Sequence, residues 1–134
     1  MPGRIRTIKP EILEDEKTAG LDDAAFRLFV ALILLADDHG NGRATPKWLD
    51  LQIWWARDAS RDIRESLASL SGCGLIQLYE ADGQHYYHLP GWAKNQKVDH
   101  PSKGRVPAPP NESNRGVAAI PRETLAKPSR ESRA

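Results

Sequence analysis

The sequence predicts an α+β fold: a small winged helix-turn-helix domain of three helices and a β-hairpin wing, followed by a disordered C-terminal tail. Three features predict it, namely an apolar segment at residues 21–36, two further capped helical segments joined by a short turn, and two β-rich runs around Asp82-Gly83. A hairpin that directly follows a helix-turn-helix is the element order of a winged helix. We therefore expect an extended N-terminal arm at residues 1–20, a winged-helix domain at 21–100, and a basic, proline-rich tail at 101–134.

Length and composition allow one small domain with a tail. The chain has 134 residues, of which 40% are hydrophobic. The single cysteine, Cys73, excludes an internal disulfide and is expected to be a small core or helix-end residue. The N-terminus has no apolar stretch of signal-peptide length, and the unbroken apolar run at 28–36 is far shorter than the ~20 residues that span a bilayer. We therefore expect a cytoplasmic protein with no membrane contact.

The arm is predicted to be extended because Lys9 precedes a proline. Ile5 and Ile8 are expected to pack on the body while Arg4 and Arg6 face water. Those arginines would form either a basic arm for phosphates or a solvated lead-in.

The central helix begins at Asp22, a good N-cap, and carries apolar residues on two opposite faces. We therefore expect it to be the buried hub of the domain. In the loop that follows, Asp37, His39 and Asn41 alternate as metal ligands do, but Trp48 stands where an EF-hand loop needs an acidic residue. A turn with a short strand at 43–44 is the preferred interpretation, without a metal or any other cofactor.

The second helix is predicted to start at Thr45-Pro46 and to run to about residue 55, with Trp54 and Trp55 half-buried at its end. After a short turn at 56–59, Ser60 would cap a third helix that runs to about residue 71 and ends at Gly72 and Gly74. A β-hairpin then follows, with strands at 75–80 and 85–89.

The third helix is the candidate DNA reader. Arg61 and Arg64 lie on its outward side, where each would make a bidentate contact to guanine worth ~1–3 kcal/mol. Ser60 and Lys47 would bind phosphates, and Gln84 and His85 at the wing tip would reach the minor groove or a phosphate. Further salt-sensitive attraction is expected from other basic residues: Arg57, Arg4, Arg6, Lys94, Lys97, Lys103 and Arg105.

Two observations leave an alternative open for these basic residues. Asp58 and Glu65 are close enough to Arg61 and Arg64 to make the third helix an ordinary solvated face with weak ion pairs. Residues 1–92 carry 10 Lys and Arg against 14 Asp and Glu, whereas residues 93–134 carry 9 against 4. The body is therefore mildly acidic, and only the tail is basic.

Catalysis finds little support in the sequence. His85 and His88 are three residues apart on a predicted strand, so their side chains point to opposite faces and cannot share a metal. The chain has no Gly-rich phosphate loop and no Gly-x-Ser-x-Gly motif. We therefore expect a protein that is not an enzyme.

Four segments carry a resemblance to a known family: RIRTIKPEILEDEK (4–17), FRLFVALILLADDHGNGR (26–43), TPKWLDLQIW (45–54) and LIQLYEADGQHYYHLPGWAKNQKVDHPSKGRVP (75–107). In their order and spacing the chain resembles the N-terminal winged-helix domain of phage and prophage replication-initiation proteins, the replisome organisers. The resemblance implies binding to double-stranded origin DNA in the cytoplasm of a bacterial host. It also implies recruitment of the replicative helicase or its loader through a separate C-terminal domain.

Only 24 residues follow Pro110, so we expect DNA binding to carry over from this family and helicase recruitment not to. Two other functions remain open: a protein-protein adaptor or homodimerisation module of a replisome, and an autoregulatory transcriptional repressor that would bind an operator-like site. Winged helices serve all three functions, and fold does not determine function.

Overall fold

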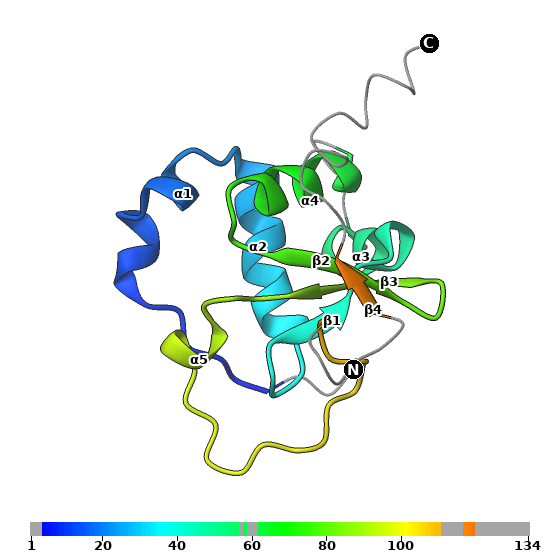
Figure 1. Ribbon diagram of the computed structural model, residues 1–134. Helices are drawn as coiled ribbons and strands as arrows, with labels where there is room; N and C mark the ends of the chain where they lie inside the picture. Colours follow the sequence, from blue (N-terminus) through cyan, green and yellow to red (C-terminus); the bar gives the residue numbers. More distant parts are fainter. Residues whose placement is uncertain (1–3, 57, 59–61, 111–116, 120–134) are drawn as a thin grey trace.

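The computed structural model describes residues 4–56, 58, 62–110 and 117–119 (Figure 1). These residues form a mixed α+β fold, which confirms the predicted α+β class. The helices are the 3₁₀ helix η1 (Pro10–Leu13), α1 (Glu16–Ala19), α2 (Asp23–Leu35), α3 (Pro46–Ile53), α4 (Ile63–Gly72) and α5 (Trp92–Asn95). The strands are β1 (Asn41–Arg43), β2 (Gln77–Ala81), β3 (Gln84–His88) and β4 (Val117–Ala119).

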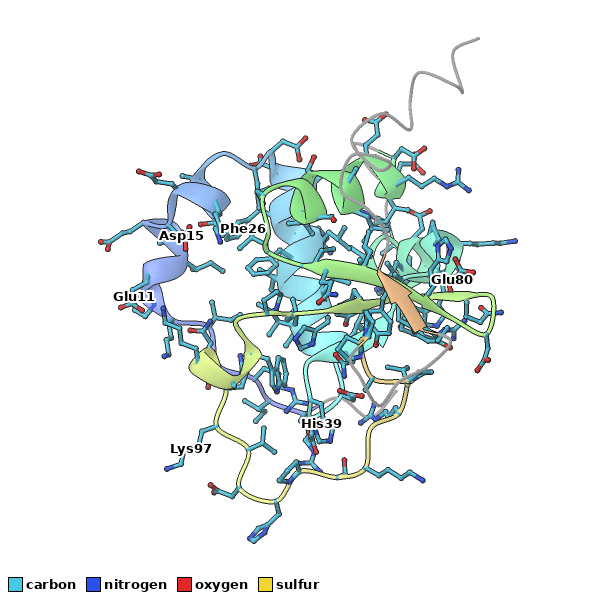
Figure 2. All side chains as sticks on the ribbon, viewed as in Figure 1. Glu11, Asp15, Phe26, His39, Glu80 and Lys97 are labelled. Carbon is cyan, nitrogen blue, oxygen red and sulfur yellow. The ribbon has the colours of Figure 1, made fainter. Side chains whose placement is uncertain are left out.

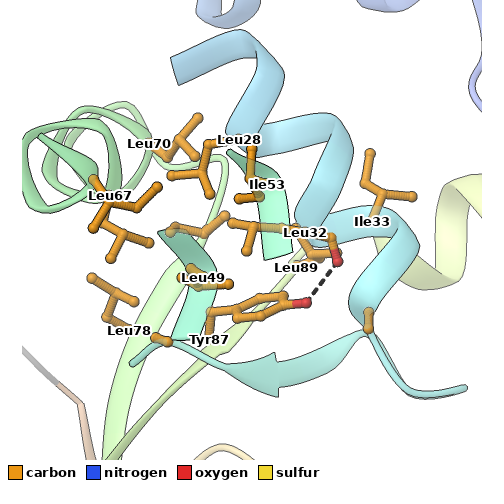
Figure 3. Close-up of a cluster of buried hydrophobic side chains, with 14 of the residues drawn as sticks. Leu28, Leu32, Ile33, Leu49, Ile53, Leu67, Leu70, Leu78, Tyr87 and Leu89 are labelled. Carbon is orange, nitrogen blue, oxygen red and sulfur yellow. Dashed lines mark hydrogen bonds between the residues drawn. The ribbon is translucent and has the colours of Figure 1, made fainter. Parts of the chain in front are cut away.

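Helix α2 is the hub of the core. The Asp22 carboxylate accepts a hydrogen bond from the Ala25 amide, which is the predicted N-cap. Leu28 and Leu32 are fully buried and belong to one hydrophobic cluster with residues from α3, α4 and the sheet (Figure 3). The opposite face is less buried than predicted, since Phe29 is only half-buried.

The sheet is antiparallel, with strand order β1-β3-β2-β4. Asp82 and Gly83 join β2 to β3, and both have positive φ, as a two-residue type I′ turn requires. The predicted hairpin is therefore confirmed. From β3, the buried Tyr87 hydroxyl donates to the Leu32 carbonyl at 2.6 Å and ties the sheet to α2 (Figure 3).

Helix α4 begins later than predicted. Asp62 is its N-cap and accepts from the Arg64 amide, so the helix starts at Ile63 and the predicted cap Ser60 lies outside the described residues. Nine residues, 54–62, therefore separate α3 from α4, more than the predicted turn. The end agrees with the prediction: Cys73 is the C-cap and Gly74 has positive φ. The Gly74 and Leu75 amides bond back to the carbonyls of residues 71 and 70 in a Schellman motif.

The two tryptophans at the end of α3 differ, contrary to the prediction that both are half-buried. Trp54 is 8% exposed and packs in the core, with the Arg27 guanidinium over its ring. Trp55 is 82% exposed. The chain leaves helical geometry at Trp54, which is the C-cap, so the core takes only the first of the pair.

Both ends of the chain are more structured than predicted. The N-terminal arm contains η1 and α1, although Lys9 has the extended backbone expected before a proline. In the predicted disordered tail, Ser102 and Arg105 hydrogen-bond to Asp38 and Asp37, and β4 pairs with β2. Residues 111–116 and 120–134 of that segment lie outside the described residues. Among the residues the structure describes, no helix is both long enough and apolar enough to cross a bilayer.

Candidate nucleic-acid interface

Helix α4 is the predicted DNA reader, and its first turn carries one exposed cation among the residues that the structure describes. Arg64 is exposed two residues after the Asp62 cap, and both Asp62 and the adjacent Glu65 are acidic. Arg57, Ser60 and Arg61, also predicted to bind DNA, lie outside the described residues. The described part of this helix start therefore carries one positive charge between two negative ones.

Helix α3 and strand β1 add two more cations. Lys47 is exposed in the first turn of α3, which Thr45 and Pro46 begin as predicted. On β1, the exposed Arg43 guanidinium lies 4.8 Å from the centre of the Trp48 ring, a cation–π contact that holds the arginine against α3. Figure 1 shows α3 and the β2–β3 turn on the same side of the molecule.

The hairpin tip presents Gln84 and His85, both exposed, as expected for a segment that reaches outward. Glu80 is the cross-strand neighbour of His85, and its carboxylate lies 3.7 Å from the His85 Nε2. A phosphate that approached His85 would have to compete with this carboxylate. His88 points to the other face, where its Nδ1 is 2.6 Å from the Asn41 Oδ1. Burial lowers the pKa of His88, opposed by the charge of Asp37.

Arg6 is not available to DNA, which corrects the prediction. Its side chain is 4% exposed, and its Nη2 donates to the Asp38 carboxylate at 3.0 Å and to the Ala36 carbonyl at 3.2 Å. The guanidinium also lies 4.8 Å from the centre of the Trp92 ring. Ile5, expected to pack on the body, is 100% exposed instead. Arg6 is buried because it pairs with the Asp38 carboxylate, which is itself buried.

That carboxylate, Asp38, is the centre of a group that we call the Asp38 cluster, which comprises Arg4, Arg6, Asp38 and Ser102. The Asp38 side chain is 2% exposed. Its Oδ2 accepts from the amide and hydroxyl of Ser102, both at 2.9 Å, and lies 3.2 Å from the half-exposed Arg4. The Ser102 amide, its hydroxyl and the two arginines hold the pKa of Asp38 well below its usual range, against the opposing effect of burial.

The other predicted cations lie elsewhere. Lys94 and Lys97 are exposed in and after α5, and Figure 2 shows Lys97 on the opposite side of the molecule from Glu80 on β2. The structure therefore brings β1 with Arg43, helix α3 with Lys47 and the hairpin tip to one side, and it leaves Lys97 on another.

Sequence reasoning missed the Asp38 cluster, and it interpreted the neighbouring Asp37 only as a rejected metal ligand. The Asp37 Oδ1 accepts from the amides of His39 and Asn41 at 2.9 and 3.1 Å, and its Oδ2 accepts from the Arg105 amide at 3.1 Å. The alternating polar residues were therefore the signal of an Asx turn. No group of three or more His, Cys, Asp or Glu side chains suited to a metal occurs in the described part of the chain.

Comparisons of the chain with protein-family models, curated proteins and solved structures found no match.

Proposed function

We propose that this protein binds double-stranded DNA through a winged-helix domain formed by α2, β1, α3, α4, β2 and β3. The observation that carries the proposal is topological. A helix, a short strand, two helices and a hairpin follow one another, and β1 pairs with β3 of the hairpin. This is the element order of a winged helix, and it sets the start of α4 as the candidate reader.

The described cations suit this role only modestly. Arg64 would contact a base or phosphate from the first turn of α4, while Lys47 and Arg43 would bind phosphates beside it. Gln84 and His85 would reach the backbone or minor groove next to the major groove that α4 enters. If only three phosphates are neutralised, the logarithm of affinity should fall with the logarithm of salt concentration with a slope of about −2.7.

We further propose that this DNA binding serves the initiation of phage or prophage replication in a bacterial cytoplasm, on the strength of the resemblance of segments 4–17, 26–43, 45–54 and 75–107 to replisome organisers. Binding at an operator-like site, with autoregulation, shares the same interface. The two roles differ in the DNA that is bound and not in the residues that bind it.

The test is fluorescence anisotropy on a duplex from around the protein's own gene and on a scrambled duplex, at several salt concentrations. The Arg64→Ala variant should lose selectivity between the duplexes if Arg64 reads a base, or lower the salt slope by about 0.9 if it binds a phosphate. Lys17→Ala, an exposed lysine on α1, is the matched control and should change neither. Equal binding by Arg64→Ala and wild type would refute the assignment of α4 as the reader. Absence of binding at low salt would refute DNA binding and favour the adaptor function.

A further inference from the structure

A hollow of about 530 Å³ opens between the N-terminal segment, α2 and α5 (Figure 2). Its apolar lining comes from Phe29 and Ile33 of α2, from Leu75, and from Ile8 and Ile12 of the N-terminal segment. Phe29 and Leu75 are only half-buried, and Ile8 is 42% exposed. The rest of the lining is polar or charged, and the volume falls within the ~300–1,000 Å³ of ligand pockets.

Charged residues of opposite sign border the hollow on two sides. Glu11 and Asp15 belong to the side formed by η1 and the start of α1. Lys9 and Lys94 belong to the α5 side, where the Lys9 ammonium donates to the Lys94 carbonyl at 3.1 Å. An occupant that complements this site therefore has an apolar centre, a positive charge at one end and a negative charge at the other.

The chain itself carries such a surface on α3 and the turn that follows it. Leu51 is 59% exposed and Trp55 is 82% exposed, and we call these two residues the exposed apolar pair. Lys47 lies four residues before Leu51 and therefore on the same helix face. Asp58, exposed, follows Trp55, and Asp50 is exposed on the neighbouring face. The exposed apolar pair thus lies between a lysine and an aspartate.

The two surfaces lie on opposite sides of one molecule. Figure 1 shows η1, α1 and α5 on one side of α2 and α3 on the other. The exposed apolar pair therefore cannot enter the hollow of its own chain. A contact between the two surfaces joins different patches of two copies, which is a heterologous contact that builds rings or open chains.

We propose that the protein self-associates head to tail, with Leu51 and Trp55 of one copy filling the hollow against Phe29, Ile33 and Leu75 of the next. In this arrangement Lys47 faces Glu11 and Asp15, while Asp58 faces Lys9 and Lys94. The contact withdraws from water a tryptophan side chain, which buries ~150–250 Å² when packed. It shares Lys47 with the proposed DNA interface but uses neither Arg64 nor the hairpin tip, and it is tested without DNA.

The experiment is sedimentation velocity of the full chain without DNA, from about 10 µM to about 1 mM, which covers the range of weak association. The wild type should increase in average mass with concentration and pass beyond a dimer. Trp55→Ser removes the inserted side chain, and Ile8→Glu places a charge in the wall of the hollow. Both positions are exposed, so both variants should fold, as circular dichroism would verify. Each variant alone should be monomeric.

An equimolar mixture of the two variants tests the head-to-tail geometry. Ile8→Glu keeps the exposed apolar pair and Trp55→Ser keeps the hollow, so the mixture should form one contact per pair of chains and stop at a dimer. Leu13→Ser, which removes a 77% exposed leucine outside the hollow, is the control and should associate as the wild type does. A monomeric wild type, association of either single variant, or a mixture without dimers would each overturn the proposal.

Discussion

Removal of the charge of Asp38 should be the most destabilising single conservative change in the described core. In the Asp38→Asn variant the shape of the side chain is kept, and the amide oxygen still accepts from Ser102. The Arg6 guanidinium, however, stays buried without its anion, since the two side chains are 2% and 4% exposed. Breaking a buried ion pair by removing one partner costs ~3–5 kcal/mol. The half-exposed Arg4 adds less than about 1 kcal/mol.

Urea unfolding followed by tryptophan fluorescence measures this loss. Trp92 is a suitable reporter because it packs against Arg6 and its Nε1 donates to the Asp38 carbonyl at 2.9 Å. Asp99→Asn, at an exposed aspartate, is the matched control and should leave the free energy of unfolding unchanged. A loss below about 1 kcal/mol in Asp38→Asn would refute the view that the Asp38 cluster contributes to stability as a buried ion pair.

The same pair of proteins has a predictable pH dependence. The pKa of Asp38 is lower in the folded than in the unfolded protein, where an aspartate titrates near 3.9. Its stabilising effect is therefore fully present above about pH 4 and is lost as the pH falls toward the folded pKa. The difference in stability between wild type and Asp38→Asn should be constant from neutral pH down to about pH 5 and should narrow below pH 4. A difference that stays constant down to about pH 3 would contradict the role of the carboxylate charge.

Two further predictions concern the loop and sheet beside this cluster. Gly40 and Gly83 both have positive φ, but a Cβ at Gly40 would lie 2.6 Å from the Trp92 ring, whereas one at Gly83 would meet nothing within 4 Å. Gly83→Ala should lower the free energy of unfolding only by the ~1–2 kcal/mol of backbone strain, and Gly40→Ala by ~1–3 kcal/mol more. Urea unfolding measures both losses. Equal losses in the two variants would show that the structure relieves the clash with Trp92. Because the folded pKa of His88 is lowered, stability should decrease as the pH falls below about 6.5, and His88→Gln should flatten this dependence in urea titrations at pH 5.5 and 7.5. An unchanged slope in that variant would assign the effect to another group.

The elements that the sequence predicted are those with local signals. Asp22 and Thr45-Pro46 begin α2 and α3, and Asp82-Gly83 forms the hairpin turn. Each of these signals lies within four residues of the helix or strand that it begins. The start of α4 was wrong because Ser60 and Asp62 are both good N-caps, and the local pattern does not choose between them. The structure places the apolar Ile63 directly after Asp62, buried in the core, and this packing selects the later cap.

The Asp38 cluster could not be predicted, because its contacts join residues 32 and 64 positions apart. Arg4 and Arg6 lie in a polar segment, and without the position of Asp38 they are indistinguishable from a basic arm. They change the functional argument as well as the fold, since the burial of Arg6 withdraws one predicted cation from a DNA interface, whereas Arg4 pairs with Asp38 and stays half-exposed. Of the described cations, Arg43 lies on β1, which pairs with β3 of the hairpin, and Lys47 and Arg64 lie in the first turns of α3 and α4. Lys94 and Lys97 lie in and after α5. If DNA contacts only the hairpin side, its affinity should therefore depend weakly on salt concentration. A steep dependence would mean that the α5 side, or residues that the structure does not describe, also contact phosphates.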